Sequence, residues 1–378
     1  MLLQTITYPD DFPINIRIVE IKNVPLHYHS DIELIYVLSG KVHLTNGYGS
    51  FTLTEGEVFT NNGHEIHSLS SCDEKNLVAV IQISNSFFTK YFPTLGMSTY
   101  RTNAIKASAS KQNDLCKMVL MILLHYFKKG LNYKNDCING TLELIDYLNK
   151  HFNLFTIENA LPVSANEENP VLIERLSRIT SYIYEHYKEK ITLENIAERE
   201  HLSVFYLSHL IKEYTGMGFR EFLCFARVER SEIPLLDTDR KVSRISREVG
   251  FSTTDFYRKF FEKWYGHSPE EHRELNKPLV MSNLNPEHAE DCSVPTAITI
   301  LKSLLYGLDA DMEIYGDMDL NPREERIVFE LPKHVFSASP TKLSLSIRDA
   351  ENNILGQTTI DCESENSSIE ILLTPKRE

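Results

Sequence analysis

The sequence predicts a multidomain α+β protein, with a β-barrel at the N-terminus, an all-α domain in the middle and a small β-sandwich-like domain at the C-terminus. Three observations predict this arrangement. The chain has 378 residues, which is more than one ordinary domain. Short apolar runs between turn residues occupy both ends of the chain. A helical period, which includes an internal repeat, occupies the region between them.

The composition is that of a soluble globular protein, with 42% hydrophobic and 24% charged residues. The formal net charge is −14, and an acidic protein repels the DNA backbone. The excess is uneven, however: residues 1–170 carry −4, residues 171–277 carry zero and residues 278–378 carry −10. The middle segment is therefore the least acidic, and nucleic-acid binding stays open for it.

The cysteines and the N-terminus predict a cytoplasmic protein. None of the six cysteines lies in a CxxC pair, so we interpret them as scattered reduced thiols. The N-terminus lacks the basic start and apolar run of a signal peptide. The longest apolar run, Met118–Leu124, is too short to span a membrane, so we expect no membrane partner.

Residues 1–107 are expected to form the barrel. Clusters such as Asn46–Gly47 and Asn61–Asn62–Gly63 separate short runs with strand character. The expected strands are Phe12–Val19, Glu33–Leu38, Lys41–Leu44, Gly49–Leu53, Glu57–Thr60 and Leu77–Ile83.

Residues 108–161 switch to a helical period and carry a wide apolar stripe. Two interpretations are open: the stripe packs on the barrel, or it forms a dimer seam through Leu115, Val119, Ile122 and Leu123. Residues 162–171 follow, and their polar stretch between Pro162 and Pro170 is expected to be a linker.

Residues 172–274 contain a tandem repeat. The segment ITLENIAEREHLSVFYLSHLIKEYTG ends at Gly216, and KVSRISREVGFSTTDFYRKFFEKWYG ends at Gly266. Aligning these glycines pairs Tyr206 with Phe256. Each unit is typical of a helix-turn-helix motif, whose second helix enters the DNA major groove. The alternative is an all-α domain whose second helices only bury apolar faces, but two units at a matching offset favour DNA binding.

Local signals delimit the helices of each unit. Thr192, Ser203 and Ser252 or Thr253 are expected N-caps, and Ser268–Glu271 is a capping box with proline at its first helical position. Gly250 is expected to supply the second turn with a positive φ. Residues expected to point inward are Leu207, Leu210, Ile211, Phe256, Phe260 and Phe261.

These stretches resemble the DNA-binding domain of the AraC/XylS family of bacterial transcription regulators. The match runs through LSVFYLSHLIKEYTGMGFREFL and VGFSTTDFYRKFFEKWYGHSPEEHR. The resemblance implies seven helices, with two helix-turn-helix units bridged by a long helix, and sequence-specific binding near promoters. Pro234 stands where the family has a helix-forming leucine, so we expect the bridging helix, Phe219–Glu232, to end or bend near Glu232.

The candidate DNA contacts are the outward residues of the two second helices, together with a basic run before and within the second unit. Cations of that run are expected to contact phosphates, which gives affinity rather than specificity. Because the domain has no net positive charge, we expect weak non-specific affinity. The candidates are Val204, Phe205, His209, Lys212, Thr253, Thr254, Asp255, Arg258, Lys259, Arg240, Arg244 and Arg247.

The barrel region carries the pattern HxHxxxEx6G from His27 to Gly40, with a later histidine at His67. It resembles the motifs of the cupin barrel, whose metal-binding members use two histidines, a glutamate and a later histidine. We favour a metal-free barrel that senses a small, sugar-like effector. The candidate effector-binding residues are His27, His29, Glu33, Tyr36, His43 and His67.

Residues 279–378 lie outside both resemblances. Expected strands are Arg326–Leu331, Lys342–Arg348, Ile354–Ile360 and Ser368–Thr374, with a hairpin turn at Asp349–Asn353 and a helix around Ala297–Leu305. No nucleophile–base or metal constellation is evident there, and the function of this region is open.

Together these features predict a transcription regulator, not an enzyme, with no resident cofactor. Its expected partners are double-stranded promoter DNA, a small-molecule effector and a second copy of the chain, with RNA polymerase as a further candidate. The alternative is a cupin enzyme or metal sensor fused to a DNA-binding module. The sequence does not distinguish an activator from a repressor.

Overall fold

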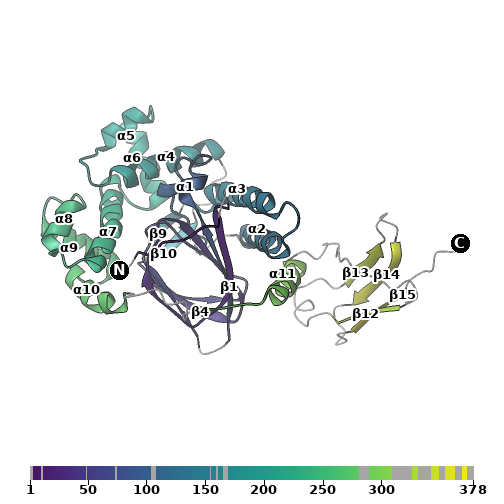
Figure 1. Cartoon of the computed structure of the whole chain (residues 1–378). Helices are drawn as coiled ribbons and strands as arrows, with labels where there is room; N and C mark the ends of the chain where they lie inside the picture. Colours follow the sequence, from purple (N-terminus) through teal and green to yellow (C-terminus); the bar gives the residue numbers. More distant parts are fainter. Residues whose placement is uncertain are drawn as a thin grey trace. The chain divides into compact units, whose positions relative to one another are not determined.

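A computed structural model gives the fold of the chain in two compact units, Met1–Ala297 and Ile298–Glu378 (Figure 1). The residues that it describes are 3–9, 12–47, 49–72, 75–103, 108–153, 155–158, 161–164, 169–280, 289–308, 326–330, 342–348, 354–361 and 368–372.

Two antiparallel sheets form the barrel at the start of the first unit. One has the order β11 (Ala289–Asp291), β1 (Ile14–Ile21), β8 (Leu77–Ile83), β3 (Ile32–Ser39) and β6 (Val58–Asn61). The other has the order β2 (Asn23–His27), β7 (His67–Ser71), β4 (Lys41–Asn46) and β5 (Gly49–Thr54).

The barrel core explains which strands the sequence could predict. Val37, Val42 and Leu69 are among the side chains that the two sheets bury between them. Each of the six expected runs coincides with a strand to within two residues. Strands β2 and β7 were not predicted, because NVPLH contains a proline and HSLSS is mostly polar.

Helices α2 (Ala109–Lys128) and α3 (Tyr133–His151) pack side by side, after the short α1 (Asn85–Phe88) and the 3₁₀ turn Leu95–Met97 (Figure 1). The apolar stripe of α2 is buried within the chain: Leu115, Val119, Ile122 and Leu123 are at most 1% exposed. These four residues are therefore unavailable for a dimer seam, and α2 packs against α3 and against β6 of the barrel.

The start of the expected linker is not an irregular segment. Strand β10 (Leu161–Ser164) pairs with β9 (Phe155–Glu158) in a two-stranded antiparallel sheet. Residues 165–168 lie outside the described part of the chain. Asn169 then caps the next helix, its side chain accepting from the Val171 and Leu172 N–H groups.

Seven α-helices follow within residues 169–280, as the family resemblance implies. They are α4 (Pro170–His186), α5 (Leu193–Arg199), α6 (Val204–Thr215), α7 (Phe219–Asp237), α8 (Val242–Glu248), α9 (Thr254–Tyr265) and α10 (Pro269–Asn276). Helices α5 and α6 form the first helix-turn-helix unit, α8 and α9 form the second, and α7 joins them.

The expected caps are present. The side chains of Thr192, Ser203, Thr253 and Ser268 each accept a backbone N–H from the first turn of their helix. The inward face of α6 is as expected, since Leu207, Leu210 and Ile211 are buried. In α9 the buried residues are Tyr257 and Phe261. Phe256 is 45% exposed, so its assignment to the inward face was wrong.

The bridging helix does not end near Glu232, although Pro234 lies inside it. It continues to Asp237 because the residues after the proline are well buried. Leu235 packs in the core of the second helix-turn-helix unit, and Leu236 packs against Leu26 and Ile66 of the barrel. Burying two leucines gives about 3–6 kcal/mol, which offsets the roughly 3 kcal/mol cost of a proline in a helix.

The chain returns to the barrel after α10 and a 3₁₀ turn, Lys277–Leu279. Strand β11 pairs with β1, and Arg17 forms an ion pair with Asp291 at 3.0 Å. The first residues of the expected C-terminal domain thus belong to the first unit. No helix in the described residues is both long and apolar enough to cross a bilayer.

The second unit begins inside α11 (Val294–Leu308). Its strands pair in two antiparallel ladders, β12 (Arg326–Glu330) with β15 (Ser368–Leu372) and β13 (Lys342–Arg348) with β14 (Ile354–Asp361). The four expected strands are therefore present. The expected hairpin turn, Asp349–Asn353, lies outside the described residues.

The turns of the two helix-turn-helix units offer a matched test of backbone strain. Both turns need a left-handed residue: His201 with φ 54° in the first, and Gly250 with φ 93° in the second. A Cβ at position 250 would also lie 2.9 Å from the Lys188 carbonyl oxygen. We expect Gly250→Ala to lower the free energy of unfolding by about 1–3 kcal/mol.

His201→Gly is the matched variant, because relief of left-handed strain and the entropy cost of glycine nearly cancel. It should change the free energy of unfolding by less than about 1 kcal/mol. Urea unfolding followed by circular dichroism measures both. Equal destabilisation by the two variants would contradict the assigned turn geometry.

Candidate functional site

Helix α6 presents an exposed and largely apolar face in its first turn. The exposed fractions are 39% for Val204, 76% for Phe205 and 46% for Tyr206. The His209 ring lies against the Phe205 ring, with centroids 4.8 Å apart. Lys212, one turn further on, is exposed. The four DNA candidates of the first unit thus lie on the surface of one helix.

Helix α9 presents a polar surface instead. Thr253 caps the helix, Asp255 and Lys259 are exposed, and Thr254 is half-buried. The Arg258 guanidinium is held by Glu270 of α10 at 2.7 Å and lies 3.4 Å from Asp255. The cation expected to contact DNA is therefore already paired within the protein.

The basic run before and within α8 is also engaged in local contacts. Arg240 and Arg244 both pair with Glu248, at 2.9 and 2.8 Å, while Arg247 donates to the Ser243 carbonyl. All three arginines are exposed. Such surface pairs contribute little energy and can exchange for phosphate.

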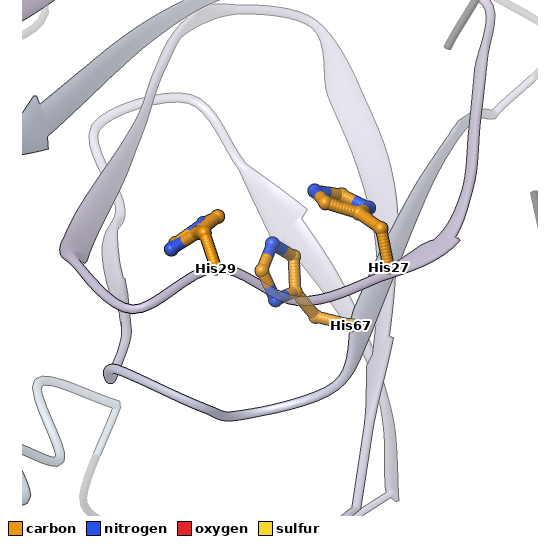
Figure 2. A group of neighbouring side chains, drawn as sticks. All are labelled: His27, His29 and His67. Carbon is orange, nitrogen blue, oxygen red and sulfur yellow. The ribbon is translucent and has the colours of Figure 1, made fainter. Parts of the chain in front are cut away.

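Three buried histidines gather inside the barrel. Figure 2 shows the rings of His27, His29 and His67 close to one another. His27 and His67 face each other across β2 and β7, with ring centroids 4.3 Å apart. His29 lies two residues beyond β2, and its ring centroid is 5.1 Å from that of His67. The chain pattern HxHxxxE and the later histidine therefore converge on one point.

Each histidine is oriented by a backbone carbonyl. The Nδ1 atoms lie 2.8 Å from the Pro25 oxygen for His27, 2.8 Å from the Asp31 oxygen for His29 and 2.9 Å from the Glu65 oxygen for His67. We therefore assign the proton to Nδ1 in each ring. The Nε2 atoms then lie on the side of the cluster, where those of His29 and His67 face the Glu33 carboxylate.

Glu33 completes the cluster from the central strand β3. Its carboxylate oxygens lie 3.4 Å from Nε2 of His29 and 3.2 Å from Nε2 of His67. It also accepts from Asn61 Nδ2 at 3.1 Å and from Gln82 Nε2 at 2.8 Å. The carboxylate is thus buried among four nitrogen atoms.

Sequence reasoning missed Asn61 and Gln82. Both are direct cross-strand neighbours of Glu33, Asn61 on β6 and Gln82 on β8. A polar residue inside an otherwise apolar strand run, as in LVAVIQI, was the available signal. The strand order needed to use that signal was not available from the sequence.

Burial and mutual charge together set the protonation of the cluster. Burial and the neighbouring His67 lower the pKa of His27 to about 3. Burial acts to lower the pKa of His29, but the Glu33 carboxylate outweighs it and the pKa is raised. Burial acts to raise the pKa of Glu33, but His29 and His67 hold it well below its usual range. The cluster therefore contains a buried carboxylate held ionised by its neighbours.

The donor set fits a transition-metal ion. One ring nitrogen from each histidine lies within 4.8 Å of the other two, and among the described residues this is the one group of three with that property. Nε2 of His29 and Nε2 of His67 are buried and make no directed hydrogen bond. Three imidazoles whose second nitrogen is fixed by a carbonyl, beside a carboxylate, are the ligands of Zn, Fe, Mn and Ni sites.

Two expected effector residues lie elsewhere. Tyr36 is on β3 three residues from Glu33, so its side chain points to the opposite face, where its hydroxyl contacts Cys116 of α2. His43 is half-exposed on β4, 3.5 Å from the Thr52 hydroxyl, while its neighbours Val42 and Leu44 fill the barrel core. Their assignment to this site was wrong, because strand alternation separates them from it.

The loop before His67 connects the cluster to helix α7. Arg230 of α7 donates to the Gly63 carbonyl at 3.4 Å, and Ile66 packs against Leu236. The buried Arg101 pairs with Glu65 of the loop at 2.8 Å and lies 3.8 Å from Glu229 of α7. The helix that bridges the two reading units thus touches the residues that position the histidine cluster.

Comparison with known proteins agrees with both halves of the first unit. The helix-turn-helix domain family matches residues 196–275, and the cupin domain family matches residues 18–83. The two matched domains are those of a DNA-binding transcription regulator with a cupin barrel. These matches agree with the resemblance to the AraC/XylS family of transcription regulators.

Individual relatives are distant. The uncharacterized HTH-type transcriptional regulator YfiF of Bacillus subtilis is 23% identical over 271 residues, which cover 69% of this chain and 82% of YfiF. The regulatory protein PocR of Salmonella typhimurium is 30% identical over 100 residues, 26% of this chain and 33% of PocR. The chain also spans about a third, 32%, of a Staphylococcus aureus relative, SAR0107, at 19% identity.

Among solved structures, the C-terminal domain of the response regulator yesN from Fusobacterium nucleatum is 31% identical. The match covers 26% of this chain and 98% of that domain, with a TM-score of 0.25.

The hydrogen bond from Gln82 to Glu33 gives a testable prediction. Gln82→Ala removes a donor 2.8 Å from a buried carboxylate, so we expect the free energy of unfolding to fall by about 1.5–3 kcal/mol. The control is Gln112→Ala, since Gln112 donates to the neutral Thr102 carbonyl and should cost about 0.5–1.5 kcal/mol. Thermal unfolding of both variants measures the difference, and a smaller cost for Gln82→Ala would contradict the ionised Glu33.

Proposed function

We propose that the tandem helix-turn-helix domain reads promoter DNA and that a small polar molecule in the barrel controls this reading. DNA binding is supported by the exposed faces of α6 and α9, each of which is the second helix of a repeated unit. The buried cluster of His27, His29, Glu33 and His67 supports control by a small molecule, because buried polar groups in a barrel suit a sugar-like ligand.

The contacts between the barrel and α7 support control of one by the other. A ligand at His67 would act on the loop that contacts Arg230 and Leu236, and so on the helix that sets the spacing of the two reading units. Ligand binding can shift this arrangement only if the ligand prefers one position of the loop. We assign the candidate DNA contacts to the twelve residues of α6, α8, α9 and their flanks named above.

We propose the domain boundaries expected from the sequence, with three changes. Strand β10 occupies the start of the expected linker, β11 belongs to the barrel, and the C-terminal unit begins inside α11. We propose a cytoplasmic homodimer that contacts RNA polymerase. Met121, exposed on α2, and Leu131, fully exposed after it, are two of the exposed apolar residues that a dimer contact could use. We also propose that the four C-terminal strands form a small β-sandwich. The strongly acidic charge of this region would keep it away from DNA.

The DNA-binding proposal is tested with the full chain. In vitro selection from a random duplex library should enrich one sequence family. Lys212→Ala should then weaken binding to all sequences alike and lower the slope of log K against log salt by about one. Lys128→Ala, on an exposed part of α2, is the control and should change neither. Selection that enriches no sequence would refute the proposal.

The geometry of the cluster favours a second candidate function, metal sensing. The histidine Nε2 atoms and the Glu33 carboxylate would hold the ion, and a bound ion would fix the position of His67 and its loop. The ion would take part in no reaction. It would coordinate the histidines, and its positive charge would balance the negative charge of Glu33.

Metal analysis of purified protein separates the two candidates. A metal sensor should hold close to one metal ion per chain, and His29→Ala should lose it. His43→Ala is the matched control, since His43 lies outside the cluster, and it should retain the ion. An equal metal content in both variants, or none in the unmodified chain, would leave the small-molecule effector as the function of the barrel.

A further inference from the structure

The two reading helices differ in the chemistry that they present at their first turn. Helix α6 presents the side chains of Val204, Phe205 and Tyr206, and Phe205 is the most exposed of the three. An exposed phenylalanine with a valine beside it has no role in the core, which Leu207 and Leu210 form from the opposite face. Covering this apolar surface with an apolar group of a partner would be favourable, because it removes the surface from water.

Base edges in the major groove offer one apolar group, the C5-methyl of thymine. Residues in the first turn of the second helix are the ones that reach base edges in a helix-turn-helix unit. The contact of Phe205 with the His209 ring keeps the phenyl group along the surface of the helix. A phenyl group in this position can cover a thymine methyl and exclude water from it.

Helix α9 exposes less apolar surface in its first turn, where Phe256 is 45% exposed and no residue matches the 76% of Phe205. It presents the hydroxyl of Thr253, the carboxylate of Asp255 and Arg258, which Glu270 holds. A carboxylate accepts from cytosine N4. Phe256 is exposed, but its ring lies against Phe260, at 4.9 Å between centroids, and Phe251. The two units should therefore read different kinds of base.

We propose that α6 selects thymine through the contact of Phe205 and Val204 with C5-methyl groups, while α9 reads the other subsite through hydrogen bonds. The proposal rests on DNA binding as the proposed function. It assigns Phe205 as a specificity-determining residue and thymine as the base that it reads. The two subsites lie about one helical turn apart.

The selected duplex locates the thymine subsite. We expect selection with the Phe205→Ala chain to relax the preference for thymine at one or two positions. Selection with Asp255→Ala should instead change positions about one turn away and retain those thymines. This pair of variants assigns each subsite to its helix.

Deoxyuridine then tests the methyl group itself, since it differs from thymidine only by that methyl. Replacing the thymines of the α6 subsite by deoxyuridine should weaken binding of the unmodified chain about fourfold per methyl. This factor corresponds to about 0.8 kcal/mol. The same replacement should change binding by Phe205→Ala less than twofold, and the Asp255→Ala chain should keep the full effect.

The selection and deoxyuridine experiments separate failure of the thymine assignment from failure of DNA binding. If selection enriches a sequence but deoxyuridine has no effect, or Phe205→Ala retains it in full, the thymine assignment is overturned while DNA binding stands. Unchanged DNA affinity and specificity in Phe205→Ala would assign the phenyl group to a protein partner instead. Circular dichroism of Phe205→Ala should match the unmodified chain, because an exposed side chain contributes little to folding.

Discussion

The burial of helix α7 on three sides is the constraint on which the first unit depends. Phe222 and Phe225 belong to the core of the first helix-turn-helix unit, Val228 and Leu235 to that of the second, and Leu236 to the contact with the barrel. One rigid helix therefore fixes both reading helices and the barrel. The same burial keeps Pro234 within the helix.

The ionisable groups of the barrel lie next to a loop that contacts α7 through Gly63 and Ile66. Glu33 is held ionised by surrounding nitrogen atoms, and the histidines beside it are fixed through Nδ1 by backbone carbonyls. Whatever ligand occupies the Nε2 side must compete with this arrangement. Gly63 and Ile66, which contact α7, precede His67 in one short segment of the chain. A displacement of His67 would therefore be passed to the contacts with α7 through only a few residues.

The net charge of the whole chain, −14, does not describe the surface of the helical domain. The helical domain is neutral, but Arg258 is held by Glu270, and Arg240 and Arg244 share Glu248. Each of these three arginines therefore already has a carboxylate partner within the protein. Among the exposed side chains, helix α6 presents a largely apolar surface in its first turn, whereas α9 presents a mainly polar one.

The sequence by itself determined the elements whose signals are local: the caps at Thr192, Ser203 and Ser268, the glycine turn at Gly250, and the repeat that pairs the two units. It also predicted that His27, His29, Glu33 and His67 act together. Tertiary structure alone decided what depends on neighbours far along the chain. Strand register brought Asn61 and Gln82 to Glu33 and separated Tyr36 and His43 from it. Burial of Leu235 and Leu236 outweighed the local penalty of Pro234. The length of a helix depends on its total free energy, which includes tertiary packing as well as the local propensity of each residue.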